Sequence, residues 1–387
     1  MLTGLRMNAT KLLQDLVRID SRSPGELNAA LAPDAVTEET LAQWVAERLQ
    51  SIGFACDLQP AAPRRPNLIA WSRRNPAWPA LAFQAHFDTV GSDGMTIPPF
   101  AAEIRAGRLY GRGAADTKGS IAAMLAALAR LQAMSVPLNL GFLGTAAEET
   151  GCEGVRELDL TGMPVDGIIV GEPTSNQPVT GHKAHLWFEL TCHGRAAHGS
   201  SPEAGDNAIY RMTEVIAVLR KVAQTFTAET PVPGFTPSTL SVDVIRGGTK
   251  VNIIPDACSV QVDVRLQPRL APVVVLEHLL REAGAAAGGK LALTWTHITP
   301  GFETPSDSRL IRALCTGLEQ TGLAPNPGTV SYCTDGGVLK EKGYDVVVFG
   351  PGSILQAHSA DEFIELAELD QAVEILVHTA QAFATGG

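Results

Sequence analysis

Short apolar runs alternate with helical patterns through the first half of the chain. The helical patterns cover residues 40–52 and 119–134. The apolar runs are typical of buried strands, and they span residues 67–71, 81–85, 138–146 and 167–170. The alternation returns near the end with a strand at 346–349 and a helix at about 366–383. This order predicts an α/β domain that has a mostly parallel sheet with helices on both faces.

The pattern changes between residues 181 and 296. Alternating, half-exposed strands are expected at residues 185–192, 239–244, 259–265 and 291–297, and helices at 207–226 and 272–286. The order β, α, β, β, α, β is that of the ferredoxin-like motif. We therefore expect an α+β domain at 181–296, inserted into an α/β domain formed by 1–180 and 297–387.

Composition narrows the class of protein. The chain has 387 residues, of which 45% are hydrophobic and 18% charged, as in globular proteins. Its formal net charge is -11, and it has no basic block that could follow a phosphate backbone. Nucleic acid is therefore not expected as a partner.

No membrane or secretory signal is recognised in the sequence. Residues 1–20 interrupt their apolar positions with charge and lack the apolar core of a signal peptide, and the run 121–129 is too short to span a bilayer. The six cysteines are scattered without paired short spacings. Reduced thiols and a cytoplasmic location are expected.

Polar residues with metal-binding side chains follow the predicted strands, where ligands collect in open α/β sheets. They are His86, Asp88, Glu148, Glu149, Glu172 and His358, joined by Asp116 just before a helix. Taken singly, each has an ordinary structural explanation; Asp116, for example, could cap the helix. Their coincidence at strand ends indicates a metal site. Imidazoles and carboxylates without a thiolate suit zinc, cobalt or manganese in an open site.

Asp116 could bridge two metal ions through its two carboxylate oxygens, which leaves each ion one His and one Glu. The adjacent pair Glu148 and Glu149 could then divide its roles, one as a ligand and the other as the general base. Asp88 lies two residues after His86 and is placed to hold the imidazole ring.

Seven segments carry a resemblance to a known family. They are HFDTV, GRGAADTKG, TAAEET, GEPT, GRAAHGSSP, NIIP and QAHSADEFI, in that order. The chain resembles the dinuclear zinc aminoacylases and exopeptidases, which include acetylornithine deacetylase, succinyl-diaminopimelate desuccinylase and glutamate-releasing carboxypeptidases. The resemblance covers nearly the whole chain and implies the zinc-exopeptidase-like fold with an inserted lid. It makes 1–180 and 297–387 the catalytic metal-binding domain and 181–296 the lid and dimerisation domain.

The resemblance also implies roles for individual residues. It makes His86 and Glu172 ligands of one metal ion, Glu149 and His358 ligands of the other, Asp116 the bridge and Glu148 the general base. The implied cofactors are two divalent ions, zinc with cobalt as a substitute. It further implies a cis peptide bond after Asp116.

The lid residues are assigned in the same way. The resemblance implies that His198 reaches the active site of the partner subunit in a homodimer and stabilises the oxyanion. Asn252 and Arg265 match positions associated with substrate binding, and a turn Asn and a surface Arg are the alternatives. Asp335 stands where the acetylornithine deacetylases commonly have Glu. It could attract a substrate ammonium or simply form a turn.

The implied function is the hydrolysis of an N-acyl amino acid, with N-acetylornithine as the first candidate substrate. The alternatives are a metallo-carboxypeptidase or dipeptidase, or a desuccinylase-like enzyme. A non-catalytic binding protein of the same fold is disfavoured, because such a chain should have lost ligands or the base, and all are present.

Overall fold

The computed structural model describes residues 7–23, 38–226 and 230–386. The chain forms two compact units. The first comprises the chain up to Gly181, Thr304–Gly328 and the chain from Thr334 onward. The second comprises His182–Glu303 and Thr329–Cys333.

A mixed sheet organises the first unit, and its strands run in the order β1-β2-β6-β3-β7-β17-β8. The four central strands β6, β3, β7 and β17 are parallel as predicted, whereas β1, β2 and β8 are antiparallel to their neighbours. The bounds are β1 Ala55–Ala62, β2 Arg65–Ser72, β3 Ala80–His86, β6 Asn139–Thr145, β7 Gly167–Val170, β8 Val179–His182 and β17 Val346–Val348.

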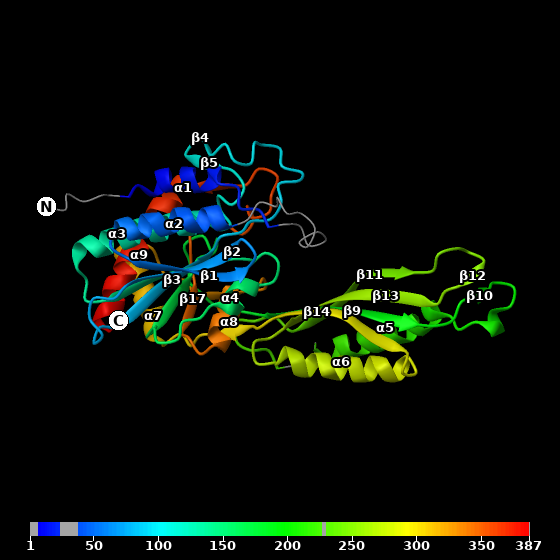
Figure 1. The fold of residues 1–387 in the computed structure, drawn as a ribbon. Helices are drawn as coiled ribbons and strands as arrows, with labels where there is room; N and C mark the ends of the chain where they lie inside the picture. The colour runs from blue at the N-terminus through cyan, green and yellow to red at the C-terminus, as the bar shows by residue number, and fades with distance from the viewer. Residues whose placement is uncertain (1–6, 24–37, 227–229, 387) are drawn as a thin grey trace. The chain divides into compact units, whose positions relative to one another are not determined.

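Helices cover both faces of this sheet, and β3 and β6 are therefore buried along their whole length. Figure 1 shows α2 and α3 on one side and α4 and α8 on the other. The helix α3 is buried on nearly all sides because it lies between the sheet, α1 and α9. The helices are α1 Ala9–Arg18, α2 Glu39–Ser51, α3 Lys118–Met134, α4 Glu153–Glu157, α7 Arg309–Gln320, α8 Asp335–Glu341 and α9 Leu366–Thr385.

One glycine keeps two strand ends close together. A Cβ atom on Gly350 would lie 2.6 Å from the carbonyl oxygen of Glu172. Only a residue without a side chain allows the segment after β17 to approach the segment after β7 so closely. Both segments carry residues of the predicted site.

The second unit contains an antiparallel sheet in the order β11-β13-β9-β14, on which α5 and α6 pack. This is the ferredoxin-like arrangement that the sequence predicts. Buried and less buried positions alternate along β13, so one face of the sheet lies on the core. The bounds are β9 Ala184–His193, α5 Ala208–Phe226, β11 Thr239–Gly247, β13 Ala257–Leu266, α6 Pro272–Ala286 and β14 Leu291–Thr299.

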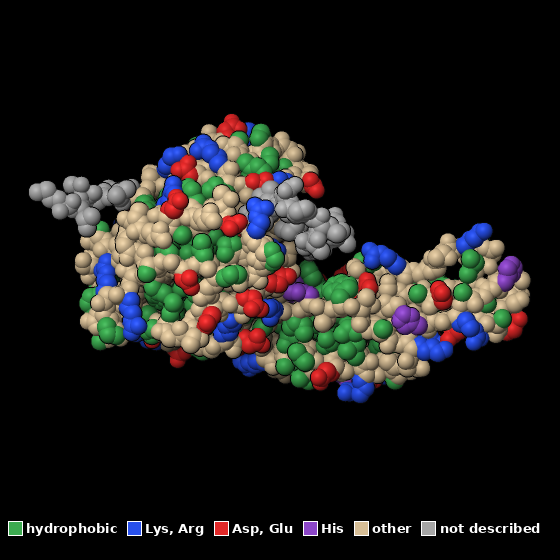
Figure 2. Space-filling model, viewed as in Figure 1, with side chains coloured by type: hydrophobic (Ala, Val, Ile, Leu, Met, Phe, Trp, Pro, Cys, Tyr) green, Lys and Arg blue, Asp and Glu red, His purple; other side chains and the backbone are tan. Residues whose placement is uncertain are grey.

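Several short elements complete the described chain. The strands β18, β5 and β4 form a small sheet, and β10 pairs with β12. The bounds are β4 Glu103–Arg105, β5 Arg108–Tyr110, β10 Ala197–His198, η1 Pro202–Ala204, β12 Ile253–Ile254, β15 Phe302–Glu303, β16 Gly328–Val330 and β18 Phe363–Glu365. Lys and Arg side chains are dispersed among acidic ones on the face shown in Figure 2. Every helix in the described part is too short or too polar to cross a membrane.

Candidate metal centre

Strand ends of the first unit place the predicted ligands. His86 is the last residue of β3, Glu149 follows β6, and Glu172 follows β7. His358 comes after β17, and Asp116 lies two residues before α3. The structure brings all five side chains together, as the distances below show.

The two carboxylate oxygens of Asp116 face different histidines. Its Oδ1 lies 3.1 Å from Nε2 of His86, whereas its Oδ2 lies 3.4 Å from Nε2 of His358. Each histidine also has a glutamate of its own: Glu172 Oε1 lies 3.9 Å from His86, and Glu149 Oε1 lies 3.2 Å from His358. The cluster is therefore divided into two halves that share one aspartate.

The carboxylates change the protonation of both histidines. Hydrogen bonds to Asp116 and Glu149 raise the pKa of His358 to about 10. Burial lowers the pKa of His86, but its contacts with Asp116 and Asp88 outweigh burial and raise the pKa well above the usual value. Burial raises the pKa of Glu172, and the negative charge of Asp116 raises it further. The cluster thus attracts positive charge.

This donor set fits divalent metal ions. Ligand atoms of His86, Asp116 and Glu149 lie within 4.8 Å of one another. The Nδ1–H of His86 donates to the backbone carbonyl of Asp88 over 2.9 Å, which leaves Nε2 to face the carboxylates as a ligand would. Neutral imidazoles and carboxylates are ligands for zinc and similar metals. The Asp116–Thr117 peptide bond is cis, as the resemblance implied.

Residues 82–382 match the model of peptidase family M20/M25/M40. The chain belongs to this family. It is a hydrolase that acts on amide bonds.

Several relatives of this M20-family chain share the same enzyme name. The acetylornithine deacetylase of Proteus mirabilis (strain HI4320) is 32% identical over 365 residues, which cover 91% of this chain and 92% of that protein. The acetylornithine deacetylase of Photorhabdus laumondii is 35% identical over 343 residues, 86% of this chain and 87% of that protein.

Solved structures share the fold. A tripeptidase from Staphylococcus aureus superposes with a TM-score of 0.79 at 20% identity, covering 98% of this chain and 100% of that one. The M20 family metallo-carboxypeptidase from Sulfolobus solfataricus gives 0.78 at 19% identity, with coverages of 98% and 99%. A dinuclear metal binding peptidase from Bacillus subtilis gives 0.72 at 17%, covering 98% of each chain.

Glu148 lies beside the cluster of this M20-family chain. Burial raises its pKa well above the usual value, although the charge of His86 opposes the shift. A raised pKa makes the carboxylate a stronger base, which favours proton uptake from water. These properties suit the predicted general base.

Asp88 does more than the sequence indicated. Its backbone carbonyl makes the short contact with His86, and its carboxylate Oδ1 lies farther away, 3.4 Å from Nδ1. The carboxylate instead accepts the backbone N–H groups of Glu148 and Glu149, over 3.0 and 3.1 Å. Asp88 therefore positions the turn that presents both glutamates.

A buried ion pair that the sequence reading missed supports Asp88. Arg65 lies 2.7 Å from Glu38 and donates to Ser23 Oγ, which in turn donates to Asp88 Oδ2 over 2.7 Å. Glu38 also accepts the N–H of Ala147. Arg65 lies just before the strand predicted at 67–71; in the structure it begins β2, and its side chain is only 11% exposed.

Glu362 supports the bridging aspartate in a similar way. It accepts the backbone N–H groups of Gly113, Ala115 and Asp116, and Arg112 donates to it over 2.7 Å. The group is buried, and burial raises its pKa. The signal for this role was Glu362's place four residues after His358 in the segment QAHSADEFI.

Asp335 is buried at the start of α8. Its Oδ2 accepts hydrogen bonds from Gln84 and Thr145, over 2.8 and 2.6 Å. Burial raises the pKa of Asp335 to about 6, and the Thr145 hydrogen bond opposes the shift. The ammonium-binding role of Asp335 stays a prediction.

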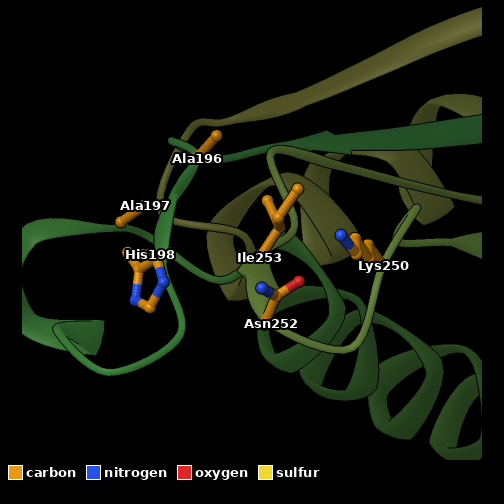
Figure 3. A pocket seen from close by; sticks show the side chains of 6 residues that line it. All are labelled: Ala196, Ala197, His198, Lys250, Asn252 and Ile253. Carbon is orange, nitrogen blue, oxygen red and sulfur yellow. The ribbon is translucent and has the colours of Figure 1, made fainter.

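The second unit carries the remaining predicted residues. His198 and Asn252 line one cavity of about 430 Å³ together with Lys250 and Ile253 (Figure 3). Nδ1 of His198 lies 2.7 Å from Ser200 Oγ. Arg265 does not line this cavity; it pairs with Asp263 over 2.7 Å.

Proposed function

We propose that this chain is a dinuclear metal-dependent amidohydrolase that removes the acyl group from an N-acyl amino acid, with N-acetylornithine as the first candidate. The division of Asp116 between two His–Glu pairs carries the proposal, because a shared carboxylate is the feature that separates a dinuclear site from a mononuclear one. The acetylornithine deacetylase relatives support the choice of substrate.

Five side chains would hold the ions. His86 and Glu172 would bind one, Glu149 and His358 the other, and Asp116 both. Zinc is the first candidate, and cobalt is its expected substitute. When bound, the ions would acidify the attacking water and polarise the amide carbonyl.

Glu148 would act as the general base. It would take the proton from the attacking water and return it to the amide nitrogen as the amine leaves. Asp88 would keep Glu148 and Glu149 turned in different directions through its hydrogen bonds to both backbone N–H groups. Glu149 would thereby bind metal while Glu148 transfers the proton.

The segment 181–296 would serve as a lid and as the contact between subunits in a cytoplasmic homodimer. We propose that His198 stabilises the oxyanion in the partner subunit's site, that Asn252 contacts the substrate, and that Arg265 clamps a substrate carboxylate. A cavity with an imidazole, an amide and the cation of Lys250 suits an anionic group.

A turnover panel tests the substrate. N-acetyl, N-succinyl and N-formyl amino acids and dipeptides are compared at equal concentration with added zinc or cobalt. N-acetylornithine is expected to give the highest kcat/KM. A clear preference for dipeptides would favour the dipeptidase alternative, and a preference for N-succinyl substrates would favour a desuccinylase.

A further inference from the structure

A second group of metal-binding side chains adjoins the metal centre. Ligand atoms of Glu148, Cys152 and Asp335 lie within 4.8 Å of one another. Cys152 and Asp335 are buried, at 2% and 1% exposure. Unlike the cluster around Asp116, this group includes a thiol, the ligand that zinc and cadmium favour.

The two carboxylate oxygens of Asp335 have different hydrogen-bond partners. Gln84 and Thr145 both donate to Oδ2. The other oxygen, Oδ1, is buried and accepts no hydrogen bond from a nitrogen or oxygen donor among the described residues. Burial raises the pKa of Asp335 and a hydrogen bond with the Cys152 thiol opposes the shift, so the thiol and this carboxylate face one another.

The distance between thiol and carboxylate suits a shared ion. Sγ of Cys152 lies 3.8 Å from Oε1 of Glu148. Bonds of about 2.3 Å to sulfur and about 2.1 Å to oxygen, at a tetrahedral angle, would separate two such ligands by roughly 3.6 Å. The side chains therefore need only a small movement to bind zinc.

We propose that Glu148, Cys152 and Asp335 form a third, inhibitory site for a thiophilic divalent cation such as zinc or cadmium. Binding releases the thiol proton to solvent and forms a metal–thiolate bond. The inhibition, though not the binding, rests on the proposed function, because a cation bound to the Glu148 carboxylate weakens its affinity for the proton of water.

Cadmium titration of the enzyme loaded with two equivalents of zinc tests this site. The wild type should bind a third equivalent, develop a thiolate-to-cadmium charge-transfer band, and lose turnover about tenfold or more. Zinc content after gel filtration checks that cadmium has not replaced the resident ions. Cys152→Ala should lose both band and inhibition. Cys258→Ala, which removes a buried thiol from the second unit, should keep both.

The outcomes separate the two proposals. A band and inhibition that persist in Cys152→Ala would overturn the third site. A band that depends on Cys152 but leaves wild-type turnover unchanged would support the cation site and contradict the role of Glu148. If Cys152→Ala fails to fold, Cys152→Ser and Asp335→Asn replace it, and both should weaken cadmium binding; unchanged binding in both would overturn the proposal.

Discussion

Nε2 of His358 lies 3.4 Å from Oδ2 of Asp116. The other oxygen of the same carboxylate faces His86. His86 ends β3, and His358 lies in the segment that follows β17. Because β7 separates these two strands in the sheet, the fold itself spaces the two halves of the site. Among the five predicted ligands, Asp116 is the one whose carboxylate oxygens face both histidines.

Glu148→Gln and Glu149→Gln should separate proton transfer from metal binding. Glu148→Gln is expected to lower kcat by about 10² to 10⁴ with two ions retained, because a general base acts in the transition state. Glu149→Gln should also lose metal. Turnover and metal content are measured on the same preparations. Equal metal loss in both variants would contradict the division of roles.

Glu362→Ala should destabilise the protein strongly. It leaves the buried guanidinium of Arg112 without its partner, which typically costs about 3–5 kcal/mol. Urea unfolding measures the loss. Glu365→Ala is the matched control, because its pair with Arg108 is 42% exposed on each side and should contribute about 0–1 kcal/mol. Similar losses in both variants would contradict the supporting role of Glu362.

The strands and the predicted ligand set follow from local sequence, because polar residues that end apolar runs meet at one edge of a parallel sheet. The contacts that support the Asp88 carboxylate could not be predicted from local sequence. Arg65 and Glu38 meet Asp88 only after β2 joins the sheet, and an Arg- and Pro-rich segment gives no local signal of burial. The strand β1 was also missed, since its positions are half-exposed and its segment contains Pro60.

His185 should determine part of the acid sensitivity. Burial and the nearby charge of Arg265 lower its pKa from 6.5 to about 3. The unfolded chain binds this proton near pH 6.5 and the folded chain does not. The stabilisation is therefore complete above pH 6.5 and is lost as the pH falls toward 3, by up to about 5 kcal/mol.

Urea unfolding across that pH range checks this prediction. His185→Leu should lose less stability between pH 6.5 and 3 than the wild type does. His193→Gln alters an exposed histidine at the end of the same strand and should follow the wild type. Parallel curves for wild type and His185→Leu would refute the assignment.

His198 should act on the partner subunit's site. His198→Ala is expected to reduce turnover by about 10² to 10³ without metal loss, as removal of an oxyanion donor does. Mixed subunits of His198→Ala and Glu148→Ala should recover activity, because one site of each heterodimer regains both groups. Verified heterodimers that stay inactive would exclude a shared site.

The position of bound zinc tests the central claim most directly. Crystals of the protein loaded with two equivalents of zinc should give two anomalous peaks roughly 3.5–4 Å apart, on opposite sides of the Asp116 carboxylate. One peak should lie beside His86 and Glu172, and the other beside Glu149 and His358. A single peak at full loading, or a pair that Asp116 does not bridge, would contradict a dinuclear mechanism.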